Sequence, residues 1–184
     1  MDMFGDMKMI LKEKSKKRIK QNAEVFTPPS LVNDMLNKLP DEVWEEGKTF
    51  VDPACGNGNF LISVLWRKCQ EGHKPLEALK TVYGADIMRD NIRECRLRLL
   101  KVISLFEEIT EEHVRAIFWN IVWINMKKYP GGSLDYDFSF NNRPKIANVR
   151  QWMENIHEKN QLDEVKLPVS EEKFTPKGCT DLFA

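Results

Sequence analysis

The feature that most constrains this chain is a glycine-rich segment, residues 50–61, with the sequence FVDPACGNGNFL. A short apolar run ends in Asp52, two glycines follow, and apolar side chains then recur at helical spacing. This order predicts a buried strand, a tight loop and a helix. Gly56 and Gly58 allow backbone angles and a close ligand approach that side chains would block. The free amides at the start of the helix favour an anionic group such as a carboxylate.

A second acid strengthens the prediction of a ligand site. Residues 82–87 predict another strand, which ends in Asp86, and in nucleotide-binding α/β folds an acid at this position binds ribose hydroxyls. Asp52, at the end of the first strand, favours an ammonium group. A ligand with a carboxylate, an ammonium group and a ribose fits this pattern, as S-adenosylmethionine (SAM) does. A dinucleotide is disfavoured, because its fingerprint GxGxxG needs a third glycine where this chain has Leu61.

Strands and helices alternate along the chain, which predicts an α/β fold with a parallel sheet flanked by helices. We expect strands at 49–52, 82–87 and 121–124, and helices at 31–39, 58–70, 76–80, 88–106, 110–118 and 150–159. Ser30 is the expected N-cap of the helix at 31–39. We divide the chain into a basic helical arm (1–20), a ligand-binding domain (21–150) and a C-terminal helix with a tail (151–184).

The long form of the loop, Asp-Pro-Ala-Cys-Gly-x-Gly-x-Phe, resembles motif I of the adenine-N6 DNA methyltransferases with the gamma order of motifs. Segments 24–29, 83–87 and 120–125 resemble the family's motifs X, II and III, in the family's order. The resemblance covers about residues 17–140 and implies a Rossmann-like SAM-methyltransferase fold. It implies SAM contacts from Phe26, Thr27 and Pro28 (motif X), from Asp52, Pro53, Ala54, Gly56, Asn57, Gly58 and Phe60 (motif I), and from Asp86, Ile87 and Asn125 (motifs II and III).

The family fold has the strand order 3-2-1-4-5, and only strands 1 to 3 are clear in this sequence, so the sheet is expected to be incomplete. The family's motif IV, an Asn/Asp-Pro-Pro-aromatic turn that holds the target base, has no match after motif III. The chain therefore resembles a family member that is truncated or altered after that point. The nearest substitute is the segment 141–145, which lacks the first proline and the aromatic residue, and its candidate catalytic residues are Asn141, Asn142 and Pro144.

The missing fourth strand leaves strand 1 at the edge of the expected sheet. An exposed edge of a buried strand is a liability, so something must cover it. The candidates are residues 135–140, residues 163–169, in which Val165, Leu167 and Val169 alternate, and a partner chain.

Charge and composition bear on the partners. Lys plus Arg (28) equals Asp plus Glu (28), so net charge does not indicate a nucleic-acid binder, but the arm at 1–20 is basic and suits DNA phosphates. The chain ends in Asp-Leu-Phe-Ala, which resembles peptides that insert a Leu and a Phe, here Leu182 and Phe183, into sliding clamps. Scattered cysteines and histidines indicate no metal site. No apolar run is long enough to span a membrane, and we expect a cytoplasmic protein.

Two functions remain open. The first is a SAM-dependent DNA adenine-N6 methyltransferase, of the restriction–modification kind, whose site is completed by the altered turn or by a second methylase subunit. The second is a catalytically inactive SAM-binding partner subunit, docked to a sliding clamp through its C-terminus. Neither the family's motif IV nor its target-recognition domain has a match after motif III, which favours the second function. The ordered motifs X to III support SAM binding in both.

Overall fold

The computed structural model describes residues 27–125, 146–159, 162–163 and 165–167 of the chain. Its strands form one parallel sheet in the order β1-β2-β3, with β1 (Phe50–Asp52), β2 (Val82–Asp86) and β3 (Ile121–Trp123). Parallel pairing brings the carboxyl ends of all three strands to one edge of the sheet. The predicted α/β fold is confirmed, and the order corresponds to strands 1, 2 and 3 of the implied family fold.

The α-helices begin and end close to where the sequence pattern predicted them, whereas a short 3-10 helix after the first of them was not predicted. They are α3 (Pro29–Leu36), the 3-10 helix η1 (Asp41–Trp44), α4 (Asn59–Gln70), α5 (Pro75–Lys80), α6 (Arg89–Ser104), α7 (Glu111–Asn120) and α9 (Ile146–Lys159). The predicted N-cap at Ser30 is wrong, because Ser30 lies inside α3 and Pro28 is the capping residue. Pro29 takes the first helical position, where its missing N–H leaves no bond unmade.

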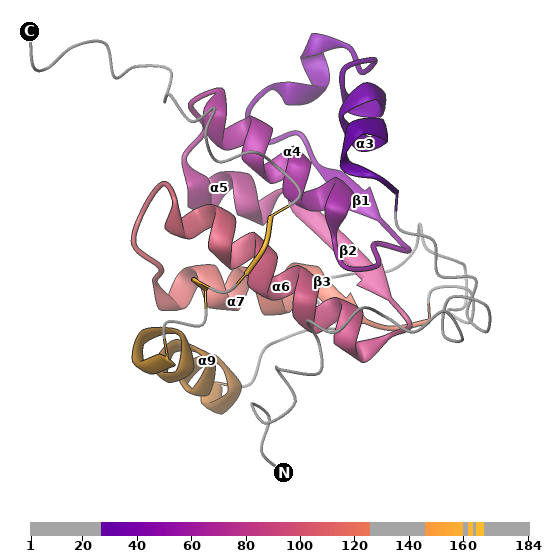
Figure 1. Cartoon of the computed structure of the whole chain (residues 1–184). Helices are drawn as coiled ribbons and strands as arrows, with labels where there is room; N and C mark the ends of the chain where they lie inside the picture. The colour runs from indigo at the N-terminus through magenta and orange to yellow at the C-terminus, as the bar shows by residue number, and fades with distance from the viewer. Residues whose placement is uncertain (1–26, 126–145, 160–161, 164, 168–184) are drawn as a thin grey trace, which may run out of the picture.

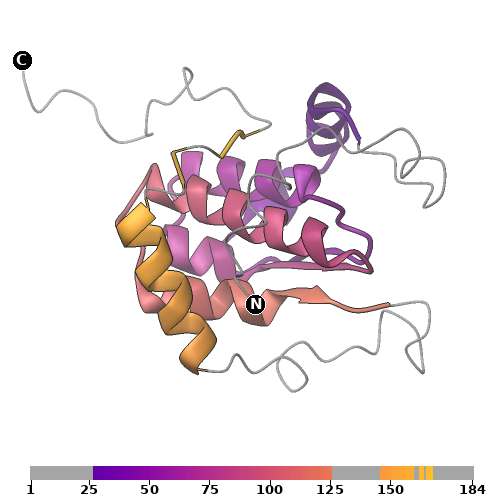
Figure 2. The same ribbon diagram turned by 60° about the horizontal axis from the view of Figure 1, so that its bottom comes forward.

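Helices α4 and α6 lie side by side and both pack against the sheet (Figures 1 and 2). α3 packs against α4, and α7 packs against both α5 and α9. The core between these elements is mostly aliphatic, and its largest fully buried apolar side chains include Leu61, Ile62, Leu65, Leu79, Leu99, Leu100, Ile103, Ile117 and Ile121. Within the described residues, no helix is long and apolar enough to cross a membrane.

Gly84 in β2 allows α4 to lie unusually close to the sheet. A Cβ at this position would lie 2.5 Å from Leu61 Cδ1 and 3.1 Å from Cys55 Sγ. Leu61 is fully buried, which limits how far it could move to make room. Gly84 therefore sets the distance between α4 and β2, and with it the position of the loop that leads into α4.

β1 is an edge strand in the described part of the chain, because it pairs with β2 alone. Phe50 packs against the core and lies next to Trp44, with the ring centroids 5.1 Å apart. Val51 points to the opposite face, as neighbouring residues of a strand do, and is 54% exposed. Because β1 pairs with β2 alone, the expected open edge of strand 1 is present within the described residues, and the exposure of Val51 shows that one face of β1 is uncovered as well.

The expected covers of this edge can be compared with the structure in part. Residues 163 and 165–167 are not in the sheet. The half-buried Val165 and Leu167 pack against the core instead, so the described part of the candidate segment 163–169 does not pair with β1. Residues 135–140 lie outside the described residues.

Lys68 of α4 is fully buried and links the beginnings of two strands. Its Nζ donates to the carbonyl oxygen of Lys48, shortly before β1, at 2.5 Å and to Thr81 Oγ1, directly before β2, at 2.7 Å. Burial lowers the pKa of Lys68 from its ordinary value of 10.5, because desolvation penalises the charged form.

We predict that Lys68→Met lowers the free energy of unfolding by about 1–3 kcal/mol, because two sheltered acceptors lose their donor. Between the lowered folded-state pKa of Lys68 and 10.5, the unfolded chain binds more protons than the folded chain. This lysine therefore makes the protein more stable as the pH rises through that window. Urea unfolding at neutral and alkaline pH should show a wild-type advantage over Lys68→Met that grows with pH. An advantage that shrinks toward alkaline pH would contradict the lowered pKa.

Candidate functional site

The loop between β1 and α4 turns at two glycines with positive φ, Gly56 at +53° and Gly58 at +89°. The N–H of Gly58 donates to the carbonyl oxygen of Cys55 at 2.9 Å, which closes the turn. Helix α4 begins at Asn59, and no side chain of the described residues caps it. The first amides of α4 are therefore available at the carboxyl edge of the sheet.

Asp86, at the end of β2, binds this loop from the adjacent strand. Its Oδ2 accepts from the N–H of Gly56 at 3.0 Å, and its Oδ1 accepts from the N–H of Met88 at 2.7 Å and from Asn91 Nδ2 at 3.4 Å. A carboxylate has about four acceptor sites. These bonds therefore leave Asp86 able to accept from a ligand as well.

Asp52, at the end of β1, is the second carboxylate of this edge. Its Oδ1 accepts from the N–H of Ala54 at 3.0 Å. Burial raises the pKa of Asp52; the hydrogen bond from Ala54 opposes that rise, and the nearby charge of Asp86 adds to it. A cationic ligand group near Asp52 would stabilise its charged form.

Two buried thiols lie at the loop, one within it and one on the helix that packs against it. Cys55 belongs to the loop and Cys95 to α6. A hydrogen bond with Cys95, together with burial, raises the pKa of Cys55 well above its ordinary value, so Cys55 is uncharged at neutral pH. A Cβ on Gly58 would lie 2.5 Å from Cys95 Sγ. Gly58 is therefore needed for its positive φ and for the room that it leaves to this thiol.

Two charged side chains of α6 hold the tip of the loop. Asn57 Nδ2 donates to Glu94 Oε1 at 2.9 Å. Arg98 Nη1 donates to Asn59 Oδ1 at 2.7 Å and to the carbonyl oxygen of Asn57 at 3.4 Å. Asn59 Nδ2 in turn donates to the carbonyl oxygen of Thr27 at 3.0 Å. One connected network therefore joins α6, the loop and the segment before α3.

Two large apolar side chains are exposed where β2 and β3 end. Ile87 is 55% exposed and Trp123 is 59% exposed. Trp123 Nε1 donates to the carbonyl oxygen of Ile87 at 2.9 Å, and the Arg89 guanidinium lies 5.7 Å from the centre of the Trp123 ring. Because Trp123 pairs with Asp86 across the strands, this apolar surface adjoins the carboxylate, and a flat ring can pack on such a surface.

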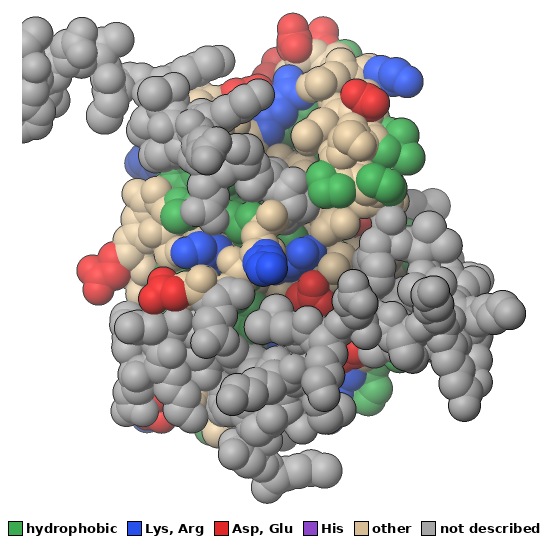
Figure 3. Space-filling model, viewed as in Figure 1, with side chains coloured by type: hydrophobic (Ala, Val, Ile, Leu, Met, Phe, Trp, Pro, Cys, Tyr) green, Lys and Arg blue, Asp and Glu red, His purple; other side chains and the backbone are tan. Residues whose placement is uncertain are grey.

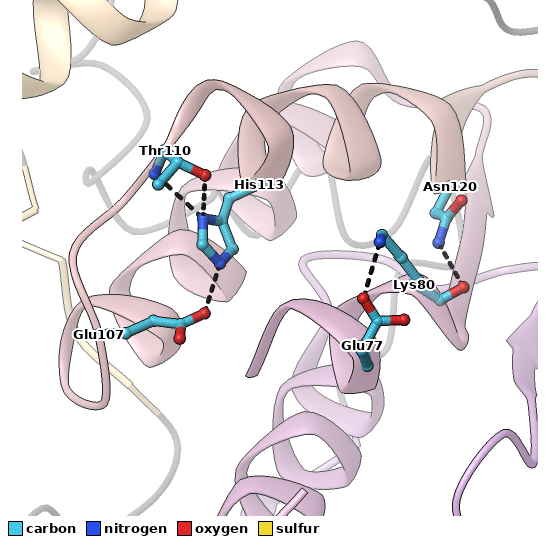
Figure 4. Close-up of polar contacts among 6 residues, drawn as sticks. All are labelled: Glu77, Lys80, Glu107, Thr110, His113 and Asn120. Carbon is cyan, nitrogen blue, oxygen red and sulfur yellow. Dashed lines mark hydrogen bonds and ion pairs between the residues drawn. The ribbon is translucent and has the colours of Figure 1, made fainter. Parts of the chain in front are cut away.

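A separate cavity of about 800 Å³ is lined by residues of α5, of α7 and of the loop before α7. Its acidic lining residues are Glu77, Glu107, Glu108, Glu111 and Glu112. His113 is held on both sides: its Nδ1 accepts from the N–H of Thr110 at 3.0 Å, and its Nε2 lies 2.7 Å from Glu107 Oε1 (Figure 4). These bonds fix the first turn of α7, and the described residues contain no cluster suited to a metal ion.

The comparison with protein families decides what kind of chain carries this site. The family described as N-6 DNA Methylase matches residues 1–116, which is more than half of the chain. The chain belongs to this family. The Type II methyltransferase M.VspI of Vibrio sp. (strain 343) is 34% identical over 87 residues. That alignment covers 47% of this chain and 19% of M.VspI, so the chain matches about a fifth of that relative's length. No solved structure matches the chain.

In this member of the N-6 DNA Methylase family, most of the residues predicted to bind SAM lie at one edge of the sheet. Thr27 accepts a hydrogen bond from Asn59 at the start of α4, the loop before α4 contacts Asp86, and Asn125 follows β3 and is half-buried. Several predicted residues lie outside the described part of the chain: Phe26, the candidate catalytic residues Asn141, Asn142 and Pro144, the basic arm at 1–20, and Leu182 and Phe183.

Sequence reasoning missed three residues of this site, namely Glu94, Arg98 and Trp123. Glu94 and Arg98 are four residues apart on a helix, a spacing that by itself indicates an ordinary ion pair. Glu94 binds Asn57, 37 residues before it, and Arg98 binds Asn59, 39 residues before it. Trp123 binds a residue 36 positions before it. Two signals in the sequence could have drawn attention to them. Glu94 and Arg98 lie on the helix that directly follows Asp86, and Trp123 lies inside the segment that resembles motif III.

We predict that Gly58→Ala destabilises the protein more than Gly72→Ala does. Both glycines have positive φ, +89° and +95°, so each variant loses about 1–2 kcal/mol to the left-handed backbone. Gly58→Ala also overlaps with Cys95, which costs about 1–3 kcal/mol more, whereas a Cβ at Gly72 meets nothing within 4 Å. Thermal unfolding of the two variants measures the difference.

A second substitution serves as the control. Cys95→Ala in the Gly58→Ala background removes the overlapping sulfur, so it should restore part of the lost stability. The recovery should be incomplete because the backbone strain remains. Equal melting temperatures for Gly58→Ala and Gly72→Ala would show that the thiol contact does not matter.

Proposed function

We propose that this methylase binds SAM at the carboxyl edge of its sheet and transfers the methyl group to the N6 amino group of adenine in DNA. One observation carries the proposal: Asp52, Asp86 and the N-terminus of α4, which no side chain of the described residues caps, lie together at one glycine loop. The chain that carries this loop belongs to the N-6 DNA Methylase family. The name of M.VspI, a Type II methyltransferase, supports methyl transfer and a restriction–modification setting.

The chemistry of this edge fits the parts of SAM. The first amides of α4 suit its carboxylate, Asp52 suits its ammonium group, and Asp86 suits its ribose hydroxyls. Asn57 supports the fit, because its Oδ1 is buried and has no hydrogen-bond partner among the described residues. A buried acceptor without a donor is costly, and a ligand hydroxyl or ammonium group would relieve that cost.

SAM, when bound, supplies a methyl group on a positively charged sulfur. The residues of the chain bind and orient it: Asp52 and Asp86 hold its polar groups through the ends of two rigid strands. Ile87 and Trp123 shield the adenine ring of SAM from water, because both present apolar surface beside Asp86. Asn125, directly after β3, binds the polar edge of that ring.

The part of the proposed reaction that handles the target base rests on residues outside the described part of the chain. We propose the altered turn at 141–144, with Asn141, Asn142 and Pro144, as the segment that holds the target amino group for direct attack on the methyl carbon. The basic arm at 1–20 would bind DNA phosphates.

A second candidate function is a SAM-binding subunit without catalysis of its own, joined to a second methylase subunit. The observation in its favour is that β1 pairs with β2 alone in the described part of the chain, which leaves its other edge open there. Val51 of β1 is also 54% exposed on one face of the sheet. Exposed apolar side chains also occur on α3, where Leu31 and Met35 are 49% and 48% exposed (Figure 3). In this candidate, a strand of the partner pairs with β1, and the C-terminal Leu182 and Phe183 dock into a sliding clamp.

Calorimetry tests the shared premise of both candidates. We expect SAM to bind the full chain and Asp86→Ala to weaken binding by about 10- to 100-fold, because the variant loses the ribose acceptor and the bond to Gly56. Asp163→Ala removes an exposed aspartate outside the sheet and the loop, and it should bind SAM as the wild type does. No binding by the wild type would refute both candidates, and equal binding by the two variants would exclude the role of Asp86.

Transfer of a labelled methyl group from SAM to unmethylated DNA separates the two candidates. The first predicts transfer by this chain alone, and Asn142→Ala should abolish that transfer while SAM affinity stays unchanged. The second predicts transfer only after a second methylase subunit with an Asn-Pro-Pro-aromatic turn is added. Transfer that survives Asn142→Ala would exclude the altered turn as the site that holds the base.

A further inference from the structure

Glu94 and Arg98 lie on α6 and contact the tip of the glycine loop, and neither belongs to the motifs of the family resemblance. We propose that they are positioning residues, which fix the loop and the Thr27 segment in the arrangement that receives SAM. The inference rests on the proposed binding of SAM. It adds two residues that act through the loop and do not touch the reacting atoms.

The bonds that these two side chains make are short and sheltered. Arg98 Nη1 lies 2.7 Å from Asn59 Oδ1, and Glu94 Oε1 lies 2.9 Å from Asn57 Nδ2. The side chains of Arg98 and Glu94 are 14% and 16% exposed and lie 3.5 Å apart, so each charge is balanced by the other. Charge-assisted bonds sheltered from water are stronger than neutral ones, and they can therefore restrain a loop whose glycines give it little stiffness.

Asn59 carries the effect of Arg98 to the Thr27 segment. Its Oδ1 accepts from Arg98, while its Nδ2 donates to the carbonyl oxygen of Thr27. Because both ends of the amide are used, its orientation is fixed. Without Arg98 the amide is free to turn, and its bond to Thr27 is no longer enforced. The loop and the Thr27 segment are therefore coupled through one guanidinium group.

Glu94 acts on the other residue of the loop tip. It binds Nδ2 of Asn57, and the Oδ1 of the same amide is buried without a hydrogen-bond partner among the described residues. Glu94 therefore keeps a free acceptor in the loop between Gly56 and Gly58. This acceptor suits a hydroxyl or ammonium group of the ligand.

Other arginines of the core make different contacts, which supplies a control. Arg96, on the same helix, donates twice to the carbonyl oxygen of Ile121, the first residue of β3. Its guanidinium also lies 4.1 Å from the centre of the Phe118 ring in α7. Arg67 on α4 resembles Arg98 in its ion pair four residues along a helix, with Glu71 at 2.9 Å. The other side-chain hydrogen bonds of Arg67 reach the end of α3 and the residue after it, away from the loop, so it is the matched control.

The test uses the full chain with Arg98→Met, Arg98→Lys and the control Arg67→Met. Hydrogen exchange without ligand reports on the amides of residues 54–60 and on the amide of Thr27. Calorimetry reports SAM affinity, and thermal unfolding reports global stability. We expect Arg98→Met to speed exchange in both segments and to weaken SAM binding about tenfold, the effect of one charge-assisted hydrogen bond. Arg98→Lys should be intermediate. Arg67→Met should lower the melting temperature without changing loop exchange or SAM affinity.

The two readouts separate this inference from the function on which it rests. If the wild type binds no SAM while Arg98→Met still speeds exchange in both segments, the proposed function is wrong and the control of the loop by Arg98 stands. If the wild type binds SAM and Arg98→Met differs from Arg67→Met in neither exchange nor affinity, the inference is overturned. Arg98→Met with Asn59→Ala should weaken SAM binding no more than Arg98→Met alone, and additive losses would overturn the coupling through Asn59.

Discussion

The close approach of helix α4 to strand β2 is the constraint on which the rest of this structure depends. It is possible because Gly84 has no Cβ, which would lie 2.5 Å from Leu61 Cδ1. A second close approach, between Gly58 and Cys95, sets the beginning of α4 against α6 in the same way. With both contacts in place, the loop before α4 crosses the ends of β1 and β2, and Asp86 can bind the N–H of Gly56.

Helix α6 supports the loop with two kinds of side chain. Cys95 is buried and packs against the loop, so it limits how close the loop can come. Glu94 and Arg98 bring charge to the same place and bind the amides of Asn57 and Asn59. Because a helix turns once every 3.6 residues, positions 94, 95 and 98 lie on adjoining parts of its surface. Packing therefore sets the distance of the loop, and polar bonds set its orientation.

The open edge of β1 is next to the same site. Asp52 is the last residue of β1, and parallel strands end at the same edge of a sheet. A strand that paired with β1 would therefore bring its own carboxyl-terminal residues close to Asp52. This edge of β1 therefore matters for the site as well as for stability, because any segment that covers it also lies next to the site.

The sequence by itself determined the strand–loop–helix unit and the place of Asp86, because apolar runs, glycine turns and helical periodicity are local properties. Local rules were wrong for Ser30, because a neighbouring proline took the first helical position. The alternation at Val165 and Leu167 did not say which surface these side chains pack on, and they pack against the core. Only the tertiary structure decided that Glu94, Arg98 and Trp123 belong to the site. The physical reason is that a sequence gives the charge and size of a side chain, whereas its partners, more than thirty residues away in each of these cases, depend on how helices and strands pack.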